Sequence, residues 1–230
     1  MSREYYLQAL IEAFNVKSKI LNDNDSVAIE DKFKIGFTYF SLEQPIVYIK
    51  EFALLLDKND KLISDDYLVY CNSKLRLKVK NRGADDTIIP PIIKMQSNDK
   101  IDPCATRPTD PEMAVIGAMQ QATGAIPFEM KPDMKTLDFD LSRLNPDVDK
   151  VIIGVYAIRD LCIGDIDLVT RFYYTHQNPL DTDYMHVLSD KFDNCYAVEI
   201  CGIYREGQSW NIKPIDKGYN DINQLIEKYK

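Results

Sequence analysis

The chain has 230 residues, 45% of them hydrophobic and 28% charged, and 36 acidic against 28 basic residues give a formal net charge of −8. This length suffices for an independent core that needs neither metal nor disulfides. A pI of about 4.9 opposes general nucleic-acid binding, because phosphate affinity comes from clustered Lys and Arg. No apolar run approaches the ~20 residues of a membrane-spanning helix, so membrane insertion is not expected.

The N-terminal segment is predicted to be an amphipathic helix followed by a polar turn, together spanning residues 1–30. Five apolar side chains recur at helical spacing in residues 2–14: Tyr6, Leu7, Leu10, Ile11 and Phe14. The turn is expected at residues 22–26, which read Asn-Asp-Asn-Asp-Ser. The segment lacks the basic start and long apolar run of a signal peptide. The expected location is therefore the cytoplasm, or a virion if a phage encodes the chain.

Beyond residue 31 the hydrophobic period changes from 3.6 to 2, which indicates β-strands. Segments rich in β-branched and aromatic residues predict strands at 33–40, 46–56, 67–71, 75–79, 136–141, 151–158, 167–174, 185–188, 197–204 and 209–215. Short strands separated by turns favour a mainly β fold, a two-sheet antiparallel β-sandwich over residues 31–230.

Two further helices are predicted. Seven of the eleven prolines lie in residues 90–132, so an inserted proline-rich arm interrupts the sandwich there. Asp110 at the N-cap and Pro111 at the first position predict a helix in this arm, with Met113, Ile116 and Met119 among its apolar residues. The C-terminal helix follows Gly218, has Asn220 or Asp221 as its cap, and carries one apolar stripe: Ile222, Leu225, Ile226 and Tyr229.

The sequence offers little for catalysis. The two histidines, His176 and His186, are interpreted as exposed side chains, and a metal site with Asp181, Asp183 or Asp190 is the alternative. Five cysteines without Cys-x-x-Cys spacing are interpreted as reduced thiols. Cys195 or Cys201 with His186 could form a nucleophile pair, but strand-like apolar surroundings raise a thiol pKa. We therefore expect no enzymatic activity.

Acidic residues at turns and strand ends are the better candidates for a site. Calcium prefers several carboxylate and carbonyl oxygens that converge from loops. Asp57, Asp85, Asp86 and Asp138 offer such oxygens, although for any one of them a solvated turn acid is the favoured interpretation in an acidic protein. These four residues are the candidate metal ligands, and no other cofactor is expected.

Three blocks of sequence carry distinctive motifs. Residues 52–72 contain a strand that ends in leucines, a turn with a lysine, Ser-Asp and a second strand. Residues 137–153 contain an acidic strand, a Leu-Ser turn and the strand after it, and residues 197–219 contain a Tyr-Arg strand, a tryptophan strand and a Gly-Tyr ending. Together, and in this order, the blocks resemble the tellurium-resistance TerD family. The resemblance implies a β-sandwich of two antiparallel sheets with short helices.

The resemblance also implies a calcium site, which is degenerate in this chain. The family's Asp-Leu-Asp-Ala motif corresponds to Tyr48-Ile49-Lys50-Glu51, so that an aromatic residue and a lysine replace two carboxylates. Its Gly-Asp-Asn-x-Thr-Gly loop corresponds either to residues 83–87, which keep Asp85 and Asp86, or to residues 122–124. The acidic run that follows in the family is missing. Loss of several anionic ligands is expected to weaken divalent binding.

These expectations combine into one hypothesis of function. A retained sandwich with a degenerate ion site favours a non-catalytic structural or interaction module, a subunit of a cytoplasmic stress-response assembly or of a phage particle. The partner, a protein or a second copy, would contact the apolar residues of segments 2–14 and 113–119, unless these pack on the chain's own sandwich. The alternative is a calcium-binding tellurium-resistance or stress-response protein with a weakened site.

Overall fold

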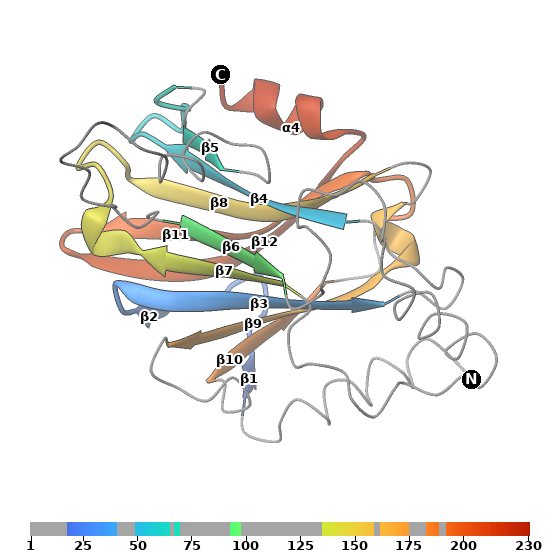
Figure 1. Ribbon diagram of the computed structural model, residues 1–230, viewed down its shortest axis with the longest axis horizontal. Helices are drawn as coiled ribbons and strands as arrows, with labels where there is room; N and C mark the ends of the chain where they lie inside the picture. The colour runs from blue at the N-terminus through green and yellow to red at the C-terminus, as the bar shows by residue number, and fades with distance from the viewer. Residues whose placement is uncertain are drawn as a thin grey trace, which may run out of the picture.

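The computed structural model describes residues 18–40, 49–64, 67–69, 93–97, 135–158, 162–174, 183–188 and 192–230. These residues form two six-stranded sheets, called sheet A and sheet B, that stack face to face (Figure 1). The mainly β sandwich predicted from the hydrophobic period is confirmed. None of the described helices is long and apolar enough to cross a membrane.

Sheet A has the strand order β1-β10-β9-β3-β7-β6. The strands are β1 (Lys19–Ile20), β10 (Tyr184–Val187), β9 (Asp167–Tyr174), β3 (Lys32–Phe40), β7 (Lys135–Asp140) and β6 (Ile93–Ser97). Neighbouring strands are antiparallel except at one edge, where β1 pairs with β10 in parallel. The sheet therefore departs from the purely antiparallel pairing expected for the sandwich.

Sheet B has the order β2-β12-β11-β8-β4-β5, with every neighbouring pair antiparallel. Its strands are β2 (Val27–Ile29), β12 (Ser209–Tyr219), β11 (Ala197–Glu206), β8 (Lys150–Ala157), β4 (Ile49–Leu56) and β5 (Leu68–Val69). Short 3₁₀ turns follow β7 and precede β9, namely η2 (Leu141–Arg143) and η3 (Ile163–Asp165).

Most predicted strands are present within one or two residues of their expected bounds, and β9 matches both ends. Three strands were not predicted. β1 and β2 lie before residue 31 and place that part of the chain within the two sheets, while β6 lies in the proline-rich arm. The predicted strand 75–79, the helix of residues 2–14 and the helix of the arm lie outside the described residues.

The core consists of alternate residues from the facing sides of the two sheets, as the pleat of a strand requires. On β3, Phe33, Ile35 and Phe37 point inward and are at most 1% exposed. On β4, Ile49, Ala53 and Leu55 belong to the same cluster. Because one face of each strand is buried in this way, the register of both sheets is fixed by the hydrophobic pattern.

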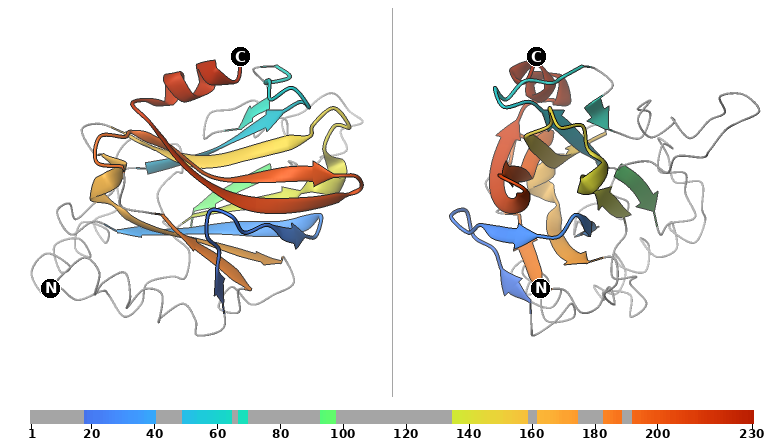
Figure 2. Two further views of the ribbon diagram at one scale, coloured as in Figure 1. Left: turned by 180° about the vertical axis from the view of Figure 1, so that it is seen from behind. Right: turned by 90° about the vertical axis from the view of Figure 1, so that its left-hand side faces the viewer.

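Helix α4 (Ile222–Lys228) covers part of the outer face of sheet B (Figure 2). Asp221, one of the two predicted caps, accepts a hydrogen bond of 2.8 Å from the backbone N–H of Gln224. Leu225 of the helix packs with Phe52, Leu54 and Leu56 in a second buried cluster. This packing explains why β4 is buried on both of its faces.

Candidate functional site

A row of four inward-facing side chains, three of them polar, crosses sheet A near the first residue of β7. The register places Lys135 opposite Phe37, Phe37 opposite Thr170 and Thr170 opposite His186, so that all four side chains share the face directed at sheet B. Lys135 and His186 stand at the two ends of this row, and each finds an acidic partner on sheet B. The sandwich interior thus holds two charged pairs that join its sheets.

The first pair joins Lys135 of β7 to Glu51 of β4. The Lys135 ammonium lies 3.2 Å from Glu51 Oε1 and donates a hydrogen bond of 2.7 Å to the carbonyl oxygen of Ile49. Burial opposes the charge of this ammonium, but Glu51 and the nearby Tyr39 outweigh burial and raise the pKa of Lys135. Lys135 therefore stays protonated as an internal cation. Both members of the pair are buried.

The second pair joins His186 of β10 to Asp216 of β12. His186 Nε2 lies 2.7 Å from Asp216 Oδ1, and His186 Nδ1 lies 2.9 Å from the carbonyl oxygen of Leu21. Asp216 has a φ of 47°, in the left-handed region that non-glycine residues rarely adopt. Strand β12 bulges at this point, with Pro214 opposite Cys201 and Lys217 opposite Glu199. The bulge directs the Asp216 carboxylate into the sandwich.

Both hydrogen-bond partners of His186 are acceptors, which decides the protonation of the pair. A neutral imidazole has one N–H, whereas a carbonyl oxygen and an ionised carboxylate both require a donor. Burial lowers the pKa of His186, but the hydrogen bond and the charge of Asp216 outweigh it, so that the pKa is raised. The expectation of an exposed His186 was wrong, because its polar partners come from other strands. His176 lies outside the described residues.

Of the four predicted calcium ligands, the two that the structure describes, Asp57 and Asp138, do not lie together. Asp57 follows β4 and accepts hydrogen bonds from the backbone N–H groups of Asn59 (2.8 Å) and Lys61 (2.9 Å), and these bonds lower its pKa. Asp138 lies on β7 of the other sheet, 3.7 Å from Lys34. Asp85 and Asp86 lie outside the described residues. Among the described residues, no group of three acidic, histidine or cysteine side chains could hold a metal ion.

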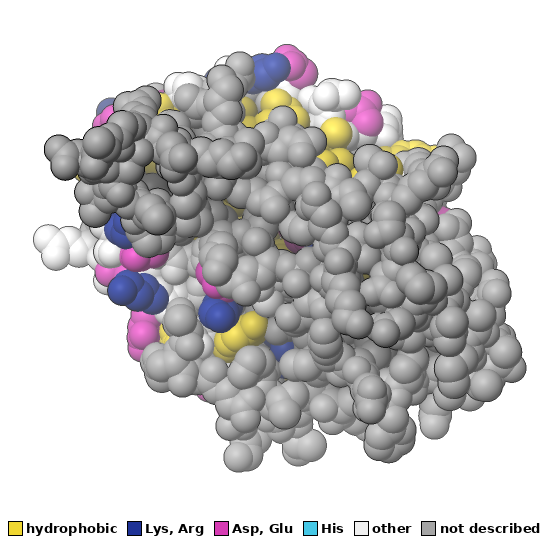
Figure 3. All heavy atoms as spheres, viewed as in Figure 1, with side chains coloured by type: hydrophobic (Ala, Val, Ile, Leu, Met, Phe, Trp, Pro, Cys, Tyr) yellow, Lys and Arg dark blue, Asp and Glu magenta, His cyan; other side chains and the backbone are white. Residues whose placement is uncertain are grey.

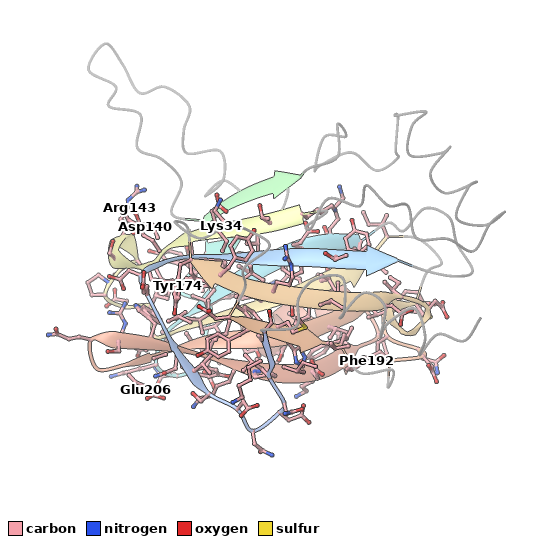
Figure 4. All side chains as sticks on the ribbon, turned by 90° about the horizontal axis from the view of Figure 1, so that it is seen from below. Lys34, Asp140, Arg143, Tyr174, Phe192 and Glu206 are labelled. Atoms are coloured by element: carbon pink, nitrogen blue, oxygen red, sulfur yellow. The ribbon has the colours of Figure 1, made fainter. Side chains whose placement is uncertain are left out.

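Charges of both signs lie close together on the described surface. Lys and Arg side chains adjoin Asp and Glu side chains on the face seen in Figure 3. Lys34, Asp140 and Arg143 lie toward one end of the sandwich, and Phe192 lies toward the other (Figure 4). Asp140, in this mixed region, accepts a hydrogen bond of 2.6 Å from the Ser142 hydroxyl. These surface acids are therefore interspersed with cations and local donors.

The segment that corresponds to the TerD calcium motif has a different chemistry here. Lys50 and Glu51 follow one another on β4 and therefore face opposite sides of sheet B. Lys50 is buried at 5% exposure, at a position where the resemblance has a carboxylate. Glu51 faces inward onto Lys135. Tyr48 lies outside the described residues.

The two candidate thiols are in surroundings that favour the protonated form. Burial raises the pKa of Cys201, which lies in the core on β11, and also raises the pKa of Cys195. A thiolate is the reactive nucleophile, so both shifts oppose nucleophilic chemistry at neutral pH. This agrees with the effect expected from the apolar sequence around both residues.

A cavity of about 240 Å³ lies beside α4 on the outer face of sheet B. Its lining comes from β8, β11, β12, the end of α4 and the turn after β4: Asp60, Lys150, Ile152, Glu199, Tyr204, Ile215, Lys217, Lys228 and Tyr229. No feature of the sequence predicts it, because isolated lysines on two strands and a helix have the pattern of ordinary solvent-facing residues.

Glu199 forms the polar floor of the cavity. Its Oε1 accepts hydrogen bonds from the hydroxyls of Tyr219 (2.6 Å) and Tyr229 (2.7 Å) and lies 3.1 Å from the Lys228 ammonium. Burial, together with the hydrogen bond to this carboxylate, raises the pKa of both tyrosines. The network fixes the last turn of α4 on sheet B.

Comparison with solved structures identifies the fold. The chain is similar to SAV2460, a protein of unknown function, with a TM-score of 0.50 and 13% identity over 85% of this chain and 94% of that one. It is also similar to SCO6318 from Streptomyces coelicolor A3(2), a homologue of telluride resistance protein (TerD), with a TM-score of 0.48, 12% identity and the same coverage. At these identities the likeness concerns the fold alone. The predicted two-sheet β-sandwich is confirmed, and the likeness to SAV2460 extends over most of both chains.

No protein-family model matches the sequence, and no curated protein matches it.

The residues expected to contact a partner lie outside the described part of the chain. They are Tyr6, Leu7, Leu10, Ile11 and Phe14 of the N-terminal segment, and Met113, Ile116 and Met119 of the arm. Their role stays a prediction from sequence.

Proposed function

We propose that this chain is a non-catalytic interaction module with a TerD-like fold, a subunit of a larger protein assembly that does not depend on a bound ion. The assembly is a cytoplasmic stress-response complex or a phage particle. The partner is a protein, or a second copy of the chain, rather than nucleic acid or membrane.

The observation that carries this proposal is the state of the β4 segment. At the positions that correspond to a calcium motif, Lys50 is buried and the carboxylate of Glu51 is paired with Lys135. A lysine thus replaces one carboxylate of the motif, and the adjacent carboxylate is occupied by a second lysine from the facing sheet, so neither position offers a free oxygen ligand to a divalent cation. Charged pairs between the two sheets occupy polar positions in the sandwich interior. The raised pKa values of Cys195 and Cys201 keep these thiols in the protonated, unreactive form. Function is then left to surfaces that contact other molecules.

The proposed contacts come from two apolar segments. The stripe of Tyr6, Leu10 and Phe14 on one side of residues 2–14 has the spacing of an amphipathic helix, which binds an apolar groove. Met113, Ile116 and Met119 of the proline-rich arm provide a second apolar surface. In the competing arrangement, either segment packs on the chain's own sandwich. Substitutions in the segment would disrupt assembly in the first arrangement and lower stability in the second.

The test is the size of the particle that contains the full chain in the cells or virions that produce it. Leu10→Glu and Phe14→Glu are expected to move the chain from a large particle to its monomer mass while leaving its thermal midpoint unchanged. Lys19→Glu, a charge change at an exposed residue, is the matched control. An unchanged particle in the apolar variants would refute docking through this segment, and a lowered midpoint would favour packing on the chain's own sandwich.

The alternative function is a calcium-binding tellurium-resistance or stress-response protein. It requires Asp57, Asp85, Asp86 and Asp138 to hold an ion, although Asp57 accepts hydrogen bonds within the turn after β4 and Asp138 is paired with Lys34 on the other sheet. Direct titration of calcium separates this alternative from the proposal.

A further inference from the structure

The cavity beside α4 concentrates positive charge in an acidic protein. Three lysines line it, Lys150, Lys217 and Lys228, against two acidic residues, Asp60 and Glu199. The chain as a whole carries a net charge of −8. The lining therefore has a formal net charge of +1, a local exception to the acidic character of the molecule, and a locally positive potential attracts anions.

The two acidic residues are already neutralised. Glu199 is 1% exposed and accepts hydrogen bonds from two tyrosine hydroxyls and from Lys228. Asp60 is paired with Lys150 at the rim. Lys228 also donates to the hydroxyls of Tyr219 (3.0 Å) and Tyr229 (2.6 Å), which uses its donors within the network. Glu199 is therefore unavailable to a cationic ligand, and the charge of the exposed Asp60 is offset by Lys150.

Hydrogen-bond donors remain at the other two lysines. Lys150 uses one of its three ammonium hydrogens on Asp60. Lys217 is exposed and lies over the ring of Tyr219 at 5.7 Å, and within the described part of the chain no carboxylate pairs with it. An acceptor-rich group that enters the cavity would meet these two ammonium groups without displacing an existing partner of Lys217.

A planar apolar surface adjoins these donors. A side chain at Gly202 would clash with Tyr204, since a Cβ there would lie 2.7 Å from the Tyr204 Oη atom. The Tyr204 side chain therefore lies against the backbone of β11. The ammonium groups of Lys150 and Lys213 lie 5.0 and 5.3 Å from the centre of its ring. Ile152 and Ile215 complete the apolar lining.

We infer that this cavity binds a small organic oxyanion, a phosphate ester or carboxylate on a planar body. The oxyanion is held by Lys217 and Lys150, and the planar body lies against Tyr204 and the two isoleucines. Charge selects the anion, and the aromatic and aliphatic lining selects the body. This binding is separate from docking through residues 2–14, and neither depends on the other.

The test is calorimetric titration of the full chain with phenyl phosphate. Saturable binding with millimolar or tighter affinity is expected, and Lys217→Gln should weaken it about tenfold because one charge-assisted contact is lost. Lys34→Gln is the matched control, since it removes the same charge from sheet A, away from the cavity, and should leave the affinity unchanged. Tyr204→Leu should weaken phenyl phosphate but leave inorganic phosphate unaffected.

Three results would overturn the inference. One is no saturable binding of phenyl phosphate to the unmodified chain. Another is equal weakening in the Lys217→Gln and Lys34→Gln variants, which would show a general effect of charge. The last is binding of benzylamine, a planar cation of similar size, as tight as that of phenyl phosphate. Lys217 is exposed, so its substitution is not expected to prevent folding, and a matching thermal midpoint checks this.

Discussion

His186 on β10 and Asp216 on β12 lie 2.7 Å apart and connect the two sheets through the interior of the sandwich. The other ring nitrogen of His186 bonds to the carbonyl oxygen of Leu21, directly after β1. One imidazole therefore links an edge strand of sheet A, its neighbour and the bulge of β12. It does so only while both ring nitrogens carry protons.

This geometry predicts a pH dependence of stability. The folded-state pKa of His186 is raised above its ordinary value of 6.5, so its contribution is fully present below pH 6.5 and is lost as pH rises through the folded pKa. The difference in unfolding free energy between the natural chain and His186→Gln should shrink from pH 6 to pH 9 in urea denaturation. His176→Gln, which removes the other histidine, should keep the natural pH profile. A difference that stays constant or grows with pH would contradict the imidazolium assignment.

Substitutions of the other pair test whether Lys135 and Glu51 act as an internal ion pair. Removing one member leaves a buried charge alone, so Lys135→Met or Glu51→Gln should each cost about 3–5 kcal/mol of unfolding free energy. The double variant Lys135→Met with Glu51→Leu should recover most of this loss. Lys34→Met, which breaks a more exposed pair with Asp138, should cost about 0–1 kcal/mol. Equal costs for Lys135→Met and Lys34→Met would refute a buried pair.

Calcium should leave the protein unchanged. Titration into chelator-treated protein is expected to give no binding heat, and millimolar calcium should not shift the thermal midpoint, since ligands that bind only the native state raise it. Heat at micromolar affinity that disappears in Asp85→Asn with Asp86→Asn would instead support the calcium alternative. Asp147→Asn is the accompanying control, because it removes an exposed carboxylate that is not among the four candidate ligands.

Native thiols should react slowly. The raised pKa values of Cys195 and Cys201 keep both thiols protonated at neutral pH, and burial also limits access to Cys201. Alkylation with iodoacetamide, followed by mass spectrometry of peptides, should label both residues far more slowly than in urea-unfolded protein. Rapid labelling of either residue in the native protein would reopen the nucleophile hypothesis.

Much of the fold follows from local sequence pattern. The alternation in residues 167–174 predicts both ends of β9, and Asp221 with the stripe that begins at Ile222 predicts α4. β12 continues beyond its predicted end at Ile215. The prediction stops there because a bulge at Asp216 shifts the register and so interrupts the alternation that marks a strand. β1 and β2 have two and three residues, too few for alternation to show.

The internal pairs could not be predicted in the same way. Lys135 and Glu51, like His186 and Asp216, belong to different sheets and meet only when the sandwich closes. A lysine at a strand start or a histidine within a strand is usually exposed, which is why His186 was expected at the surface. The identity of a partner on the facing sheet depends on the packing of the two sheets, for which a single sequence holds no local signal.

The most direct test of the account is the mass of the assembly that contains the chain, measured by light scattering after size fractionation with a calcium chelator present. We predict a particle heavier than the monomer that persists in chelator and falls to monomer mass in Leu10→Glu. A chain that is monomeric throughout, or a particle that forms only when calcium is added, would contradict an ion-independent interaction module.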